Sequence, residues 1–108
     1  MKSKLELRKE KYAEQLKKIG APVNKALLDK VADMLGPSNY KIDAMFVAAS
    51  DPKELDRVYK NFLVKKLGCK DEKKGRKMIA SVAEKMSPIR KKYRGVFYYL
   101  LAKKMGLK

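Results

Sequence analysis

The stretch VFYYLLA, residues 96–102, decides the fold, because aromatic or aliphatic side chains occupy every position in it. A surface helix is apolar on one side only, whereas a helix that is apolar nearly all round is enclosed by other elements. We therefore predict that this stretch lies in a central helix that the rest of the chain surrounds. The predicted helix begins at Ser87-Pro88, a capping residue followed by a proline of the first turn, and ends at Gly106.

Two helices are predicted in the N-terminal third from apolar residues at helical spacing. The first covers about residues 3–18 and ends at Gly20. The second covers residues 25–35 behind the capping residue Asn24. It ends at Gly36-Pro37, because the residue before a proline avoids helical geometry.

The third helix has the clearest start in the chain. Asp51 is a capping residue, Pro52 occupies the first turn, and Glu54 completes a capping box. This helix is predicted to end at Gly68. A fourth helix is predicted behind Asp71, which is again a capping residue.

Residues 38–50 are open to two interpretations. Asp43 is able to cap a single helical turn over residues 44–47, and a packed extended segment also fits the apolar content. No segment shows the sustained alternation of a half-buried strand, and no hairpin dipeptide separates two such runs. The predicted class is therefore all-α, a compact bundle of about five helices in a single domain over residues 1–108.

The composition excludes several kinds of chemistry. The 108-residue chain has no histidine and one cysteine, Cys69, so neither a nucleophile–histidine arrangement nor a cysteine-rich metal site is available. The carboxylate pair Asp29/Asp33 has the spacing of a solvated helix face, and no glycine-rich loop has a phosphate-binding pattern. We predict a protein that is not an enzyme and has no metal, cofactor or evident small-molecule substrate.

The cellular compartment is predicted from the same composition. A single cysteine is typical of a reducing compartment. The basic N-terminus has no apolar run behind it, and the longest apolar run, residues 96–102, is far shorter than a membrane span of roughly 20 residues. We predict a cytoplasmic protein that does not associate with membranes.

Positive charge is concentrated in the C-terminal half of the chain. The net charge is +16. Residues 1–63 hold 13 Lys and Arg against 9 Asp and Glu, a net +4, whereas residues 64–108 hold 15 against 3, a net +12. Such an asymmetry favours a polyanionic partner, either a nucleic acid or an acidic protein.

Two groups of residues form the predicted polyanion-binding surface. On the fifth predicted helix, Lys91, Arg94 and Tyr98 follow one another at about one turn and are expected to form an outward strip. The fourth helix and its entry add five cations: Lys70, Lys73, Lys74, Arg76 and Lys77. Contacts of this kind hold a phosphate backbone without reading base edges, so non-specific RNA or DNA is the first expectation.

Other interpretations stay open at the level of sequence. The lysines would also form a solvated face that only keeps the protein in solution. A protein-interaction or homodimerising domain is the alternative function, and its test is an apolar face that the bundle leaves uncovered. A role on membrane surfaces ranks lower, because one shared core explains the apolar helix faces better.

Several runs of residues together resemble a known family. They are KYAE (11–14), LGPSNY (35–40), SDPKEL (50–55), NFLVKKLG (61–68) and KYRGVFYYLL (92–101). In this order and spacing they resemble the domain of unknown function 2853 family, over about residues 11–106. The resemblance implies a compact helical domain of this length, encoded as a stand-alone bacterial protein, and it implies no activity, ligand or catalytic residue.

Overall fold

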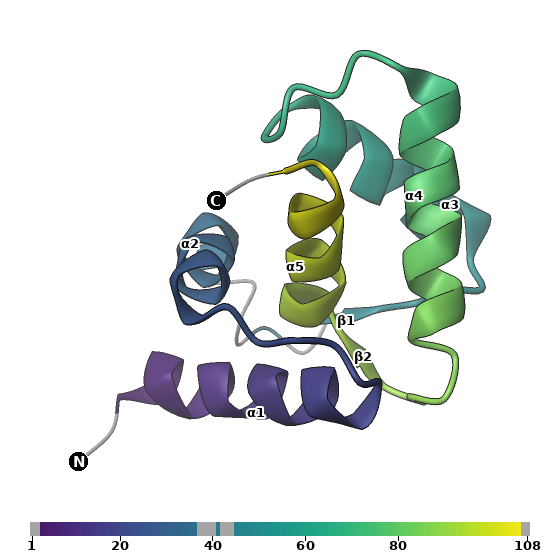
Figure 1. The fold of residues 1–108 in the computed structure, drawn as a ribbon. Coiled ribbons are helices and arrows are strands. Elements are labelled where there is room, and N and C mark those ends of the chain that lie inside the picture. Colours follow the sequence, from purple (N-terminus) through teal and green to yellow (C-terminus); the bar gives the residue numbers. More distant parts are fainter. Residues whose placement is uncertain (1–2, 37–40, 42–44, 107–108) are drawn as a thin grey trace.

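The computed structural model describes residues 3–36, 41 and 45–106, and Figure 1 shows how their elements are arranged. Most of the described chain is helical. In chain order the elements are α1 (Lys4–Lys18), α2 (Lys25–Leu35), β1 (Phe46–Val47), α3 (Pro52–Val58), the π-helix η2 (Tyr59–Val64), α4 (Glu72–Lys85), β2 (Lys92–Tyr93) and α5 (Arg94–Lys104).

The C-terminal helix α5 is the centre of the fold, as the sequence predicts. Every residue from Gly95 to Ala102 is buried. The helices α1, α2 and α4 and both strands contact α5, and α2 and α4 lie on opposite sides of it in Figure 1. The predicted class, a mainly helical bundle around the apolar C-terminal helix, is confirmed.

Local capping explains where most helices begin. The side-chain oxygen of Asn24 accepts a hydrogen bond from Leu27 N (3.2 Å), and that of Asp71 accepts one from Lys74 N (3.1 Å). Each bond satisfies a backbone amide that has no partner inside its own helix. Because the signals are short-range, the starts of α1, α2 and α4 agree with the sequence prediction.

The start of α5 differs from the prediction, because the helix begins at Arg94 and not at Ser87-Pro88. The cause is a tertiary contact from α1. Gln15 Nε2 donates to Lys91 O (2.7 Å), and Gln15 Oε1 accepts from Tyr93 N (3.2 Å). These bonds take backbone groups that a helix would use within itself, so residues 89–93 are not helical and the helix begins only at Arg94.

The extended segment before α5 pairs with a second one. β1 and β2 are antiparallel, with Phe46 opposite Tyr93 and Val47 opposite Lys92. For residues 38–50 the extended interpretation is therefore confirmed at Phe46–Val47, and a helical turn through Val47 is wrong. The predicted cap, Asp43, lies outside the described residues.

The third predicted helix changes its winding partway. α3 continues directly into η2, where hydrogen bonds join residues five apart: Lys65 N donates to Lys60 O (3.3 Å) and Leu67 N to Phe62 O (3.0 Å). A π-turn is wider than an α-turn. The segment ends at Gly68, whose φ of +68° is the left-handed conformation that favours glycine.

Candidate functional site

The predicted strip of Lys91, Arg94 and Tyr98 is not an outward surface. Lys91 precedes β2 and does not lie on α5, so helical spacing does not align it with Arg94. The Arg94 side chain is 12% exposed, and Tyr98 is 7% exposed. The prediction is wrong for two reasons. It assumed a helix that begins before Lys91, and it placed Arg94 and Tyr98 on the outer face of that helix, whereas the fold encloses both side chains.

Arg94 is instead a connection between elements. Its Nη2 donates to Glu54 Oε1 on α3 (2.5 Å) and to Phe46 O on β1 (3.4 Å), and its Nη1 donates to Tyr98 Oη (2.9 Å). Burial alone lowers the pKa of Arg94, but Tyr98 and Glu54 outweigh it, so that the pKa rises overall. Arg94 and Tyr98 therefore belong to the fold and not to the candidate surface.

The same contact corrects the predicted role of Glu54. A capping box requires this carboxylate to accept from the Asp51 amide, but Asp51 N donates to Ala48 O (3.0 Å). The Asp51 side chain still caps α3, through Lys53 N (3.0 Å). The Glu54 carboxylate lies against Arg94 because a buried guanidinium needs a counter-charge.

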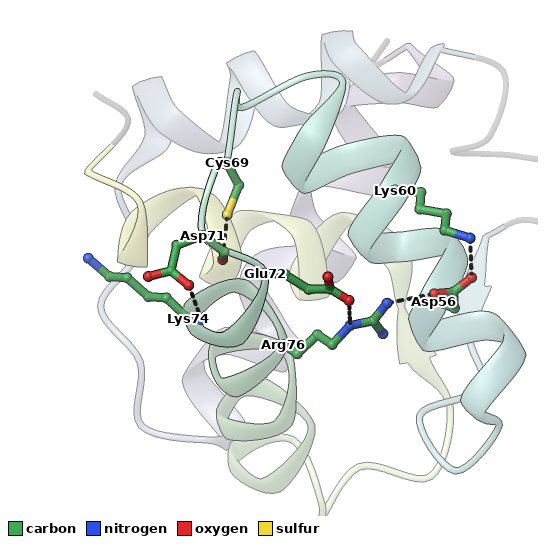
Figure 2. A network of polar contacts seen from close by, with 7 residues as sticks. All are labelled: Asp56, Lys60, Cys69, Asp71, Glu72, Lys74 and Arg76. Carbon is green, nitrogen blue, oxygen red and sulfur yellow. Dashed lines mark hydrogen bonds and ion pairs between the residues drawn. The ribbon is translucent and has the colours of Figure 1, made fainter.

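Arg76 is also occupied within the fold, as Figure 2 shows. Its Nη2 lies 2.9 Å from Asp56 Oδ1 on α3, and its Nε lies 3.0 Å from Glu72 Oε1 on α4. The hydrogen bonds from Arg76 and then Lys60 lower the pKa of Asp56. The guanidinium also lies over the Tyr59 ring, 4.7 Å from its centroid. Arg76 thus joins α4 to α3 and η2, and its charge is locally neutralised.

The remaining residues of the predicted set are exposed. Lys70, Lys73, Lys74 and Lys77 are all exposed at the N-terminal end of α4. Lys91 is exposed as well, but it lies beyond the other end of α4, with its ammonium 5.8 Å from the centre of the Phe46 ring. The structure therefore separates Lys91 from the four lysines.

Four further lysines, which the sequence analysis did not single out, belong with these four. α5 runs antiparallel to α4, so that the C-terminal end of α5, the end of η2 and the N-terminal end of α4 lie at one end of the molecule (Figure 1). We call this surface the lysine-rich end. Its members, all exposed, are Lys65, Lys66, Lys70, Lys73, Lys74, Lys77, Lys103 and Lys104.

Among the described residues, the lysines of the lysine-rich end form no ion pairs with neighbouring carboxylates. None of the ion pairs that join described residues involves any of the eight lysines. The nearest acidic residues in sequence are already engaged: Asp71 caps α4, and Glu72 pairs with Arg76 (Figure 2). This end of the molecule is therefore a concentrated cationic surface.

The position of two of these lysines is electrostatically unfavourable for the helix that carries them. Lys73 and Lys74 lie in the first turn of α4, behind its cap Asp71. The N-terminus of a helix has a partial positive charge, so that cations there cost up to about 1 kcal/mol each. Helix formation therefore does not account for the presence of lysines at these two positions, whereas an anion bound at this end would.

Aromatic side chains are not part of the lysine-rich end. Among the described aromatic residues, Phe46 and Tyr93 alone are partly exposed, and both lie on the β1–β2 pair. A surface of lysines without aromatic rings contacts phosphate groups and does not stack on bases. Such a surface is therefore suited to contact the phosphate backbone of a nucleic acid.

The described residues show neither a metal-binding cluster nor a membrane-spanning helix. They contain no group of three or more His, Cys, Asp or Glu side chains placed to hold a metal ion. No helix in the part of the chain that the structure describes has the length and apolar character needed to cross a membrane.

The fold and this surface define a small, mainly helical protein with an apolar C-terminal helix at its centre and a lysine-rich end. The chain belongs to the family described as protein of unknown function, DUF2853, whose model matches residues 11–108. The resemblance seen in the sequence is thereby confirmed over nearly the whole chain. A search of the curated proteins found no match.

Proposed function

We propose that this protein is a bacterial cytoplasmic protein that binds RNA or DNA without sequence specificity, through its lysine-rich end and without catalysis. The observation that carries the proposal is the gathering of eight exposed lysines at one end, from the segment between η2 and α4, from α4 and from α5. None of them is ion-paired among the described residues. These lysines come from segments that are separated in sequence, yet they form one surface. A charge that only keeps the protein in solution would not need to be clustered in this way.

The spacing of negative charge on a nucleic acid suits such a surface. Duplex DNA carries one charge per about 1.7 Å of helix axis, so several ammonium groups engage phosphates at once and release condensed counterions. A protein interface, by contrast, usually has apolar or aromatic side chains at its centre. At the lysine-rich end the one large apolar side chain that is exposed among the described residues is Val64.

The proposed contact positions a backbone and reads no sequence. Lysine is a flexible point charge, whereas the planar fork of arginine is the usual reader of guanine edges. The one arginine in the predicted α4 set, Arg76, is held by Asp56 and Glu72. We therefore expect similar affinities for unrelated sequences of the same length.

Three adjacent lysine pairs make a matched test of the proposal. Lys73→Gln/Lys74→Gln and Lys103→Gln/Lys104→Gln remove two charges each from the lysine-rich end. Lys17→Gln/Lys18→Gln removes two charges from the last turn of α1, a position that matches that of Lys103 and Lys104 on α5. Binding of fluorescent RNA and DNA oligonucleotides is measured by anisotropy from about 50 to 200 mM salt, a range in which phosphate contacts weaken strongly.

We expect both pairs at the lysine-rich end to weaken binding of every sequence and to reduce the salt slope by about two, because each phosphate contact contributes about one. The α1 pair is expected to change little. Binding that does not depend on salt, or equal losses in all three variants, would contradict the proposal.

The alternative function, a protein-interaction or homodimerising surface, stays a prediction. The large apolar side chains that are exposed among the described residues are Leu7, Val23 and Val64, and they come from three different segments of the chain. Because no observation favours a second function, none is proposed.

A further inference from the structure

Arg8 on α1 has a polar atom for which the described structure supplies no partner. Its Nε is buried, and no described residue accepts a hydrogen bond from it. A buried N–H without an acceptor destabilises the folded state, and more so when the group is charged. Such an atom is rare in folded proteins, and an ion or water bound beside the guanidinium is one physical explanation of it.

The Arg8 guanidinium is held in place from one side. It lies over the Tyr93 ring, 5.2 Å from the centroid. That ring is in turn stacked with Phe46 (5.0 Å between centroids) and meets the edge of Tyr12 (5.3 Å). Gln15 holds the backbone of Tyr93, so the platform under Arg8 is itself fixed. A guanidinium that is already positioned loses less entropy when it binds a ligand.

Arg8 also lines a depression in the surface of α1. The depression has a volume of about 320 Å³ and is lined by Lys4, Leu7, Arg8 and Lys11. The three cations follow one another at spacings of four and three residues, so they lie on one helix face. Like charges at this spacing disfavour the helix, and no carboxylate is among the described residues that line the depression.

We propose that this depression binds a phosphate group, with Arg8 as its main donor and Lys4 and Lys11 beside it. An oxyanion that enters the depression meets the guanidinium of Arg8, whose Nε has no acceptor among the described residues. Three cations, with no acid among the described lining residues, suit a doubly charged phosphate better than a single carboxylate. The guanidinium edge binds two oxygens of one phosphate. Lys4 and Lys11 are exposed and able to adjust around the ligand.

The site is independent of the lysine-rich end. Its residues lie on α1, whereas the proposed nucleic-acid surface is formed by α4, α5 and the segment between η2 and α4. The phosphate has three sources to distinguish: inorganic phosphate, a small phosphomonoester such as glycerol phosphate, and the phosphodiesters of an oligonucleotide without terminal phosphate.

The direct test is the Nε–Hε signal of arginine side chains in ¹⁵N–¹H NMR spectra, recorded while each of the three probes is added at constant ionic strength. Arg8→Lys assigns the signal by its disappearance and keeps the charge. Arg57→Lys is the matched control, because the Arg57 side chain is 63% exposed and lies on α3.

We expect the Arg8 signal to move with saturation on adding inorganic phosphate or the phosphomonoester, while the Arg57 signal stays nearly fixed. Arg8→Lys should weaken phosphate binding, followed by backbone amide shifts of α1, by about tenfold, and Arg57→Lys should not. A response to the oligonucleotide alone would overturn the assignment to a phosphomonoester-type ligand. An unmoved Arg8 signal, or equal shifts in Arg8 and Arg57, would overturn the site.

Discussion

Two glycines show how single residues set the distance between helices. A Cβ atom at Gly95, at the start of α5, would collide with the ring of Tyr12 on α1, and one at Gly75 on α4 would lie 2.8 Å from Tyr59 Cε1. A glycine inside a helix normally costs about 1 kcal/mol relative to alanine. Here the missing side chain is needed, because an aromatic ring occupies its space.

Gly95→Ala is therefore expected to destabilise the protein by about 1–3 kcal/mol, against the gain that alanine usually brings to a helix. Urea unfolding measures the change. In the background of Tyr12→Leu, which shortens the opposing side chain, the same substitution should cost clearly less. Equal costs in both backgrounds would show that the ring is not the cause.

At the residue scale, the sequence predicts less reliably whether a charged or polar side chain is exposed than whether an apolar side chain is buried. Arg94 and Tyr98 are enclosed because Glu54, 40 residues away, supplies a counter-charge that no local pattern reveals. Arg76 is neutralised by Asp56, which is 20 residues away. The exposure of Lys73 and Lys74 was predictable from local sequence alone, because both follow the helix cap Asp71 by two or three residues.

The contact between α3 and α5 depends on the ion pair of Arg94 and Glu54, each with a side chain 12% exposed. Replacing one partner, as in Arg94→Met, leaves the other charge buried and should cost about 3–5 kcal/mol. Replacing both, as in Arg94→Met/Glu54→Leu, should restore much of that loss. The test is thermal and urea unfolding of the wild type, both single variants and the double variant. If the losses of stability in the single variants simply add in the double variant, the two side chains are not coupled.

The ion pair between α3 and α4 should make the free energy of unfolding depend on pH. The Asp56 carboxylate has its pKa lowered below the ordinary value of 3.8 by Arg76 and Lys60, so its ionised form stabilises the folded state. This contribution is complete above pH 3.8 and disappears as the pH falls through the lower native pKa. Asp56→Asn should therefore differ from the wild type near neutral pH and converge with it in acid.

Unfolding curves of both proteins between about pH 6 and pH 2 measure the convergence. Asp33→Asn, on the exposed face of α2, controls for the loss of one negative charge. A difference between Asp56→Asn and the wild type that stays constant over the whole range would contradict the pairing.

At the scale of elements, prediction succeeded where the signals are local. The caps Asn24 and Asp71 act within three residues, and their helices begin where expected. The start of α5 depends on Gln15, 76 residues from Lys91, and on Arg94 N, which donates to Met45 O (2.7 Å). The lysine-rich end likewise depends on the antiparallel course of α4 and α5, which the sequence does not specify.

Over the whole molecule the dominant feature is a net charge of +16 on 108 residues. Self-repulsion of this size destabilises a compact state and is screened by salt. The lysine-rich end adds to it at the start of α4, where the helix itself disfavours cations. We therefore predict that these lysines reduce the stability of the folded state and increase the affinity for nucleic acid.

The most direct test of this claim measures the thermal midpoint and the RNA dissociation constant of Lys73→Glu/Lys74→Glu at low salt, beside Lys17→Glu/Lys18→Glu with the same net charge. We predict that the α4 pair raises the midpoint by a few degrees and weakens binding more than about tenfold. The α1 pair places acids at a helix C-terminus and should not raise the midpoint, with affinity within about twofold of wild type. Unchanged affinity of the α4 pair, or the same loss in both, would contradict a binding surface at the lysine-rich end.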